Sequence, residues 1–241
     1  MISIIFPTLN EESVIADTIQ RIKSKMTLPH EVIISDGQSK DHTVEIARMY
    51  ADKVVEYTGT TRQNIAMGRN AGAAVATGEF LVFMDADCTI EDPDKFFAEA
   101  VNNFEKHPKL VALCAWLKVL PDLETWADKI VFDVQNVFCI MVNDIFRKGI
   151  SPGGEFQMMR AETFRKLGGY NEKLIASEDV ELFRRLTKLG KIRLDPKLVV
   201  MHSGRRAHKI GWPHLLSLWF LNTVWMSFAG KSFTKEWKPI R

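Results

Sequence analysis

Short apolar runs alternate with longer segments of helical spacing along the first 107 residues of the chain. Each apolar run is nearly continuous, which is typical of a strand buried on both faces of a parallel sheet. Strands are expected at residues 2–6, 30–35, 54–57 and 80–84. Helices are expected at residues 11–25, 41–50, 61–77 and 93–107. This alternation predicts an α/β fold with a mostly parallel sheet and helices on both faces.

The alternation is less regular after residue 107. The elements expected there are a strand at 110–120, an apolar helix at 122–146, a glycine-rich segment that becomes a strand at 151–160, helices at 161–168 and 178–190, and a last strand within 191–202. No linker rich in proline, glycine or serine divides the chain. We therefore predict one domain over residues 1–208, built from halves at 1–107 and 108–208 and followed by a helical tail at 209–241.

Composition narrows the class of protein. Of the 241 residues, 46% are hydrophobic and 26% are charged, as in ordinary globular proteins. The net charge of +2 argues against a nucleic-acid partner. The three cysteines are widely spaced and form neither a disulfide framework nor a zinc pattern, which favours a reducing compartment. The apolar start is too short for a signal peptide, so we expect a cytoplasmic location.

The acidic pair Asp85 and Asp87, with Ala86 between them, follows the apolar run at 80–84 directly. A strand that ends in this way delivers two carboxylates to its carboxyl end, where open α/β sheets bind ligands. Oxygen ligands suit Mg²⁺ and Mn²⁺, which commonly bridge a carboxylate to substrate phosphates. The pair therefore indicates a metal-diphosphate site, and the alternative is the acidic start of a surface loop.

Two further polar segments follow predicted strands. The segment Pro7-Thr8-Leu9-Asn10-Glu11 comes after the first strand, and Asp36-Gly37 comes after the second. Three such strand ends in one sheet line a single crevice. The alternatives are structural: Asn10 and Asp41 suit helix N-caps, and Asp36-Gly37 suits an ordinary turn.

Downstream residues add candidate chemistry. Arg69 lies on the helix before the acidic strand, where its guanidinium could reach a diphosphate or simply face solvent. Gly154 lies in a Gly-Gly loop that permits close backbone approach to a ligand, although the loop could be only a loop. Glu178 and Asp179 open a helix after Ser177, which is a plausible N-cap. A carboxylate there could act as a general base or could serve the helix dipole.

A histidine and two arginines follow the last predicted strand. His202 could be a further metal ligand, although a lone histidine is often structural. Arg205 and Arg206 could bind phosphate.

Taken in order, these motifs resemble a known family. They are Phe6-Pro7-Thr8-Leu9-Asn10-Glu11-Glu12, Ser35-Asp36-Gly37, Gly68-Arg69-Asn70-Ala71-Gly72, Asp85-Ala86-Asp87, Gly168-Gly169-Tyr170 and Ser177-Glu178-Asp179. The combination resembles the family 2 glycosyltransferases, whose GT-A fold is Rossmann-like, over residues 2–206. The resemblance implies an inverting transferase that moves a sugar from a UDP- or GDP-linked donor with the help of Mn²⁺ or Mg²⁺.

The resemblance also assigns roles. It places the nucleotide sugar on Pro7, Thr8, Leu9, Glu11, Asp36, Arg69, Asp85 and Ala86. It makes Asp87 the metal ligand, with His202 in the place of a late metal-binding histidine, and Asp179 the base. The half at 1–107 would bind the nucleotide and the half at 108–208 the acceptor, with acceptor or phosphate contacts from Gly154, Glu178, Arg205 and Arg206. Processive members carry a Gln-x-x-Arg-Trp motif after the base, and its absence here favours transfer of a single sugar.

The tail at 209–241 differs from the rest of the chain. Residues 201–241 hold seven Lys or Arg against one acidic residue, and the 21 residues between Lys209 and Lys231 hold no Asp, Glu, Lys or Arg. Polar residues dilute that stretch, so an amphipathic helix at the membrane interface fits better than a span. The alternative is a helix packed on the domain or on a second subunit of a homodimer. Contact with lipid would make a lipid-phosphate or glycolipid acceptor attractive, with the protein at the cytoplasmic face of the membrane.

Two rival functions remain open at this point. A nucleotidyltransferase also places acids at strand ends, but it usually needs a glycine-rich basic loop that residues 7–12 lack. A non-catalytic nucleotide-sugar-binding or scaffold protein would need neither Asp87 nor Asp179.

Overall fold

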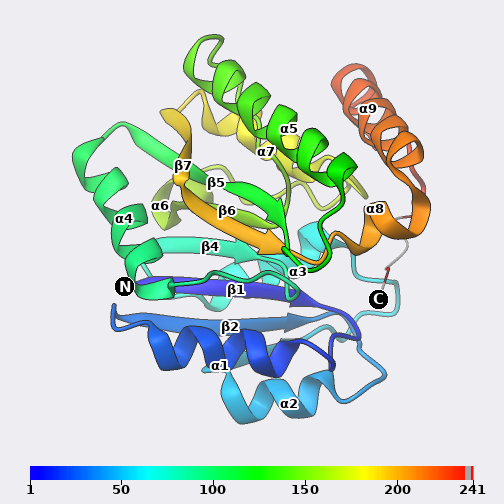
Figure 1. Ribbon diagram of the computed structural model, residues 1–241. Helices are drawn as coiled ribbons and strands as arrows, with labels where there is room; N and C mark the ends of the chain where they lie inside the picture. The colour runs from blue at the N-terminus through cyan, green and yellow to red at the C-terminus, as the bar shows by residue number, and fades with distance from the viewer. Residues whose placement is uncertain (237–239, 241) are drawn as a thin grey trace.

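The computed structural model describes residues 1–236 and 240 and contains a seven-stranded sheet with helices on both faces (Figure 1). The strand order is β3-β2-β1-β4-β6-β5-β7. The strands are β1 (Ile2–Thr8), β2 (His30–Asp36), β3 (Lys53–Glu56), β4 (Phe80–Met84), β5 (Leu110–Val119), β6 (Phe156–Arg160) and β7 (Lys191–His202). β6 is antiparallel to β4 and to β5, and the other neighbouring pairs are parallel. The predicted mostly parallel α/β sheet is confirmed.

The sheet separates two layers of apolar core, and each layer is covered by helices. They are α1 (Ile15–Lys25), α2 (Thr43–Tyr50), α3 (Ile65–Val75), α4 (Pro93–Lys106), α5 (Trp126–Asp144), α6 (Ala161–Lys166), α7 (Glu178–Leu186), α8 (Arg205–Ile210) and α9 (Trp212–Ala229). Apolar side chains of α1, α2 and α4 pack on one face of the sheet, and those of α3, α6 and α7 pack on the other. Strand residues alternate accordingly: Ile4 and Phe6 of β1 join the first layer and Ile5 joins the second.

Strand direction explains why distant segments meet at one edge of the sheet. The carboxyl ends of β1 and β2 lie side by side, with Thr8 paired to Asp36. Because β6 runs the opposite way to β4, its first residue, Phe156, pairs with the last residue of β4, Met84. β7 is parallel to β5, and its last residue, His202, is at the same edge. This edge therefore gathers the segments that follow β1, β2, β4 and β7 and the one that precedes β6.

The first helices begin later than expected because the residues before them form a turn instead. Asn10 adopts a positive φ of 55°, and its side chain accepts a hydrogen bond from the backbone of Lys40 at 2.7 Å. It therefore links two loops, and Val14 occupies the N-cap position of α1. Ser177 does occupy the N-cap position of α7, but its side chain makes no capping hydrogen bond.

The tail packs on the domain through a buried carboxylate. Asp128, in the first turn of α5, accepts hydrogen bonds from Trp212 Nε1 and His208 Nε2, both at 2.8 Å. Leu215, Asn222 and Met226 of α9 are buried, but many of its apolar side chains are exposed: Leu216, Phe220, Leu221, Trp225 and Phe228. Among the described residues, no helix combines the length and apolarity that a membrane span requires. The end of the predicted tail, residues 237–239 and 241, lies outside the described part.

Candidate active site

A cavity of about 780 Å³ opens at the edge where the strand ends gather. Its wall includes the candidate residues Pro7, Thr8, Leu9, Glu11, Arg69, Asp85, Ala86, Asp87, Gly154, Glu178, Asp179, His202, Arg205 and Arg206. Residues up to 194 positions apart are in direct contact there, as in the pair Glu11 and Arg205. The fold therefore brings the predicted residues of both halves to one place.

Asp36 is the candidate that does not line the cavity. Its side chain is buried, and its Oδ1 accepts hydrogen bonds from Thr8 Oγ1 at 3.2 Å and Ser39 Oγ at 2.5 Å. The neighbouring Gly37 lines the cavity instead. In this structure Asp36 therefore braces Thr8 and the following loop.

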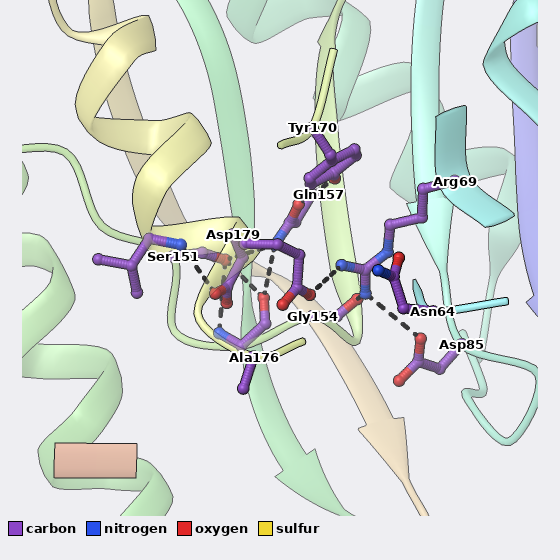
Figure 2. Close-up of polar contacts among 12 residues, drawn as sticks. Asn64, Arg69, Asp85, Ser151, Gly154, Gln157, Tyr170, Ala176 and Asp179 are labelled. Carbon is purple, nitrogen blue, oxygen red and sulfur yellow. Dashed lines mark hydrogen bonds and ion pairs between the residues drawn. The ribbon is translucent and has the colours of Figure 1, made fainter. Parts of the chain in front are cut away.

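Arg69 is a buried hub (Figure 2). Its Nη1 donates to Glu178 Oε1 at 2.9 Å, and its Nη2 donates to the carbonyl of Gly154 at 3.0 Å and lies 3.6 Å from Asp85 Oδ1. The guanidinium also lies over the ring of Tyr170. Only 2% of the residue is exposed, so the solvent-facing alternative is wrong. Arg69 ties three segments of the site together, and a side chain on residue 154 would collide with it.

The cavity concentrates negative charge. Burial raises the pKa of Glu178 to about 7, with repulsion from Asp179 adding to the effect. Burial likewise raises the pKa of Glu155 to about 7, with repulsion from Asp87 and Asp179. The pKa of Asp85 is raised by burial and by repulsion from Glu155 and Asp87, against the attraction of Arg69. The carboxylates around Arg69 therefore outnumber its single positive charge. A divalent cation bound there would stabilise their ionised forms.

Asp87 is held by two groups that follow β7. Its Oδ2 accepts hydrogen bonds from Ser203 Oγ and faces Arg205 Nε at 3.2 Å. Arg205 also donates to both carboxylate oxygens of Glu11, at 2.8 and 2.9 Å. The guanidinium therefore bridges the loop after β1 and the loop after β4.

His202 presents one unpartnered ring nitrogen. The ring is buried edge-on against Phe132, its Nδ1 accepts from the backbone of Gly204 at 3.2 Å, and its Nε2 has no partner among the described residues. Burial lowers the pKa of His202, which favours the neutral form that binds metals. With Nδ1 accepting, however, the proton lies on Nε2. Metal binding through Nε2 therefore requires the contact with Gly204 to break.

The donor set suits a metal that is shared with a substrate. No group of three or more His, Cys, Asp or Glu side chains in the described part of the chain is arranged to hold a metal ion alone. Mg²⁺ typically binds through one or two carboxylates and completes its coordination with water and substrate phosphates. Asp87, within a carboxylate-rich cavity, fits that pattern.

Several site residues were not expected from the sequence. Glu155 precedes β6, and it lies at this edge because β6 is antiparallel, a direction that the sequence does not reveal. The tail also lines the cavity, with Leu215, Trp219, Asn222 and Lys235. Ser232 Oγ accepts hydrogen bonds from the backbone of Ile175 and Ala176, so the tail holds the loop that leads to Asp179. Packing on the domain is thus part of what the tail does.

Comparison with known proteins agrees with this architecture. The sequence model of the family described as Glycosyl transferase family 2 matches residues 3–172. The succinoglycan biosynthesis protein ExoA of Rhizobium meliloti (strain 1021) is 29% identical over 211 residues, which are 78% of this chain and 58% of that protein. The chain therefore spans little more than half the length of this relative.

Two solved structures share the fold at low sequence identity. The mannosyltransferase PcManGT from Pyrobaculum calidifontis, in complex with GDP-Man and Mn²⁺, has a TM-score of 0.72 at 21% identity, over 95% of this chain and 63% of that one. The glucosyl-3-phosphoglycerate synthase of Mycobacterium tuberculosis, in complex with Mn²⁺, UDP and its product, has a TM-score of 0.64 at 18% identity, over 97% of this chain and 81% of that one. The GT-A fold and the family resemblance are confirmed: this chain belongs to glycosyl transferase family 2.

Proposed function

We propose that the protein is an inverting, metal-dependent glycosyltransferase that moves one sugar from a nucleotide-diphosphate sugar to an acceptor hydroxyl or phosphate. The observation that carries the proposal is the presence of Asp87 and Asp179 in the wall of a single cavity. One acid suits a metal ligand and the other suits a base, and an inverting displacement needs one of each.

The donor would lie along the loops after β1, β2 and β4. Pro7, Thr8, Leu9, Gly37 and Asp85 line that part of the cavity. Asp87 would hold Mn²⁺ or Mg²⁺ against the diphosphate, with His202 as a second ligand. The metal would neutralise the charge that develops on the departing nucleoside diphosphate. The GDP-Man and UDP complexes of the two structural neighbours support a UDP- or GDP-linked donor.

Asp179 would take the proton from the attacking acceptor. Its side chain is half-buried in the cavity, and its Oδ1 accepts from the backbone of Val180 at 2.7 Å, which orients the carboxylate. Glu178 is instead occupied by Arg69, and therefore suits support of the loop rather than proton transfer. A single base at a fixed position is sufficient for an in-line displacement.

The acceptor side of the cavity favours a lipid-linked acceptor. Its wall includes the apolar residues Phe132 of α5 and Trp212, Leu215 and Trp219 of α9, and Arg206 also lines the cavity. Apolar side chains would contact a hydrocarbon chain, and an arginine would bind its phosphate. The exposed apolar side chains of α9 would let the protein rest on the cytoplasmic face of a membrane.

Thermal unfolding in the presence of UDP-, GDP- and dTDP-sugars, with and without Mn²⁺, tests the proposal. A ligand that binds only the native state raises the melting temperature. We expect one nucleotide class to do so in a Mn²⁺-dependent manner, and the shift to disappear in Asp87→Asn. Asp133→Asn, which changes a carboxylate of α5 that does not line the cavity, is the matched control. A wild-type protein that no nucleotide sugar stabilises would contradict the proposal.

A further inference from the structure

Glu155 carries a buried carboxylate oxygen with no hydrogen-bond partner in the described part of the chain. Its Oε2 is shielded from solvent and accepts no hydrogen bond from any described residue, although the side chain lines the cavity. A buried carboxylate oxygen without a hydrogen bond is costly, because it has lost its contacts with water and gained none in return. Because the side chain lines the cavity, a rotation of the carboxylate would turn this oxygen towards a hydrogen-bond donor of a bound ligand.

The position of Glu155 is fixed by its surroundings. Its carbonyl accepts hydrogen bonds from the backbone of Asp85 at 3.3 Å and from Cys88 Sγ at 3.5 Å, so its backbone is tied to the loop of the acidic pair. Its carboxylate folds back over Gly153, where any Cβ would overlap Oε2. The glycine therefore makes room for this orientation.

A second unpartnered acceptor faces the same loop. Gln135 of α5 donates its Nε2 to the carbonyl of Pro152, next to Gly153, and its Oε1 is buried without a partner among the described residues. Gln135 also lines the cavity. Two acceptors in one cavity that have no donor among the described residues suit a ligand that carries several hydroxyl groups.

Glu155 lines the same cavity as Asp87, the proposed metal ligand, and Asp179, the proposed base. Both acids repel its carboxylate. In a transfer of the kind proposed above, the sugar must lie between the metal-bound diphosphate and the base. Glu155 therefore adjoins the space that the transferred sugar would occupy.

We propose that Glu155 accepts a hydrogen bond from a hydroxyl group of the transferred sugar and thereby determines which sugar the enzyme selects. This role rests on the proposed function and adds a specificity-determining residue to it. A carboxylate accepts strong hydrogen bonds from hydroxyls, and a sugar epimer that points the hydroxyl elsewhere would leave it unpaired.

Isothermal titration calorimetry with UDP-glucose, UDP-galactose, UDP-N-acetylglucosamine, GDP-mannose, UDP and GDP, all with Mn²⁺, tests this role. The proteins are the wild type, Glu155→Ala, Glu155→Gln and Gly153→Ala, which displaces the carboxylate without removing it. The control is Glu105→Gln, on the exposed surface of α4. In Glu155→Ala we expect affinity for the preferred nucleotide sugar to fall about 10- to 100-fold, with affinity for the nucleoside diphosphate unchanged.

The pattern of losses decides the outcome. A preference of the wild type for one sugar epimer that collapses in Glu155→Ala and weakens in Gly153→Ala supports the role. An equal loss of affinity for the nucleotide sugar and for the nucleoside diphosphate would overturn this role in favour of metal binding or structural support. Unchanged affinity and unchanged epimer preference would overturn it outright. A wild type that binds none of the nucleotides rejects the proposed function itself, and this role with it, before any variant is compared.

Discussion

Arg205 Nε lies 3.2 Å from Asp87 Oδ2, so a guanidinium contacts the carboxylate that we propose as the metal ligand. The same side chain donates to both oxygens of Glu11. Arg205 therefore supplies a positive charge to both Asp87 and Glu11 in this structure. We infer that binding of a metal and a diphosphate turns Arg205 from Asp87 towards phosphate.

The change Arg205→Ala should separate the two functions of the guanidinium, which are the contact with Asp87 and the inferred contact with substrate phosphate. Without its competitor at Asp87, the protein should bind Mn²⁺ alone several-fold more tightly. The nucleotide sugar should bind about tenfold more weakly, because a charge-assisted contact with phosphate is lost. Titration of Mn²⁺ and of the donor by calorimetry measures both, with Arg193→Ala on β7 as the control. A parallel loss of metal and donor binding would contradict the inference.

The pH dependence of turnover should report Asp179. Burial raises the pKa of this carboxyl above the usual aspartate range. A base acts in its deprotonated form, so kcat/KM should fall as the pH drops through this raised pKa, which lies above the ordinary value of about 3.9.

The Asp179→Asn variant supplies the comparison. It should keep donor binding while kcat falls by about 10²- to 10⁴-fold, and its residual rate should lack this acidic limb. Glu181→Gln, two residues further along α7, should leave the profile unchanged, because Glu181 is paired with Arg185. A wild-type profile without an acidic limb above the ordinary aspartate range would argue against Asp179 as the base.

The sequence predicted those parts of the site that depend on parallel strands. Asp85 and Asp87 follow a continuous apolar run, so their place at the carboxyl edge followed from the expected strand. Glu155 could not be placed in the same way, because apolar spacing does not distinguish a parallel from an antiparallel strand. Trp219 was expected in a helix, but its place in the cavity wall depends on long-range packing of α9.

The sequence also did not reveal the direction in which some site side chains point. Asp36 ends β2 as expected, yet its carboxylate points to Thr8 and Ser39 and not into the cavity. Arg69 was expected near the donor and does line the cavity, and the structure adds that it is buried beside Glu178 and Asp85 as a hub within the protein. Spacing along the chain indicates where a residue lies, whereas partners from distant segments determine what its polar atoms do.

Glu31 of β2 should make folding stability depend on acidic pH. Burial would raise the pKa of Glu31, but hydrogen bonds from Lys53, Ser3 and Thr77 outweigh it and lower the pKa to about 2. The folded state therefore favours the ionised form, by about 3 kcal/mol at neutral pH. That stability is present above the unfolded pKa of about 4.3 and is lost as the pH falls towards 2.

The change Glu31→Gln should therefore destabilise the protein by about 2–3 kcal/mol at pH 7, and by much less at pH 2–3. Urea unfolding at the two pH values measures the difference. Glu105→Gln, which is exposed, should unfold like the wild type at both. A destabilisation of equal size at both pH values would show that the loss is one of packing and not of charge.

Asp128 should couple the stability of the tail to the acceptor side of the cavity. Its fully buried carboxylate accepts from the backbone and hydroxyl of Thr125, which form a capping box, and from His208 and Trp212. In Asp128→Asn one oxygen is replaced by a donor that faces these donors. We expect a loss of about 1–3 kcal/mol in the free energy of unfolding. We also expect weaker acceptor binding, because Trp212 and Trp219 line the cavity.

Asp122→Asn, exposed before α5, is the control. Tryptophan fluorescence during urea unfolding should show an early transition in Asp128→Asn alone, and an unchanged single transition would show that α9 is held by its apolar contacts instead.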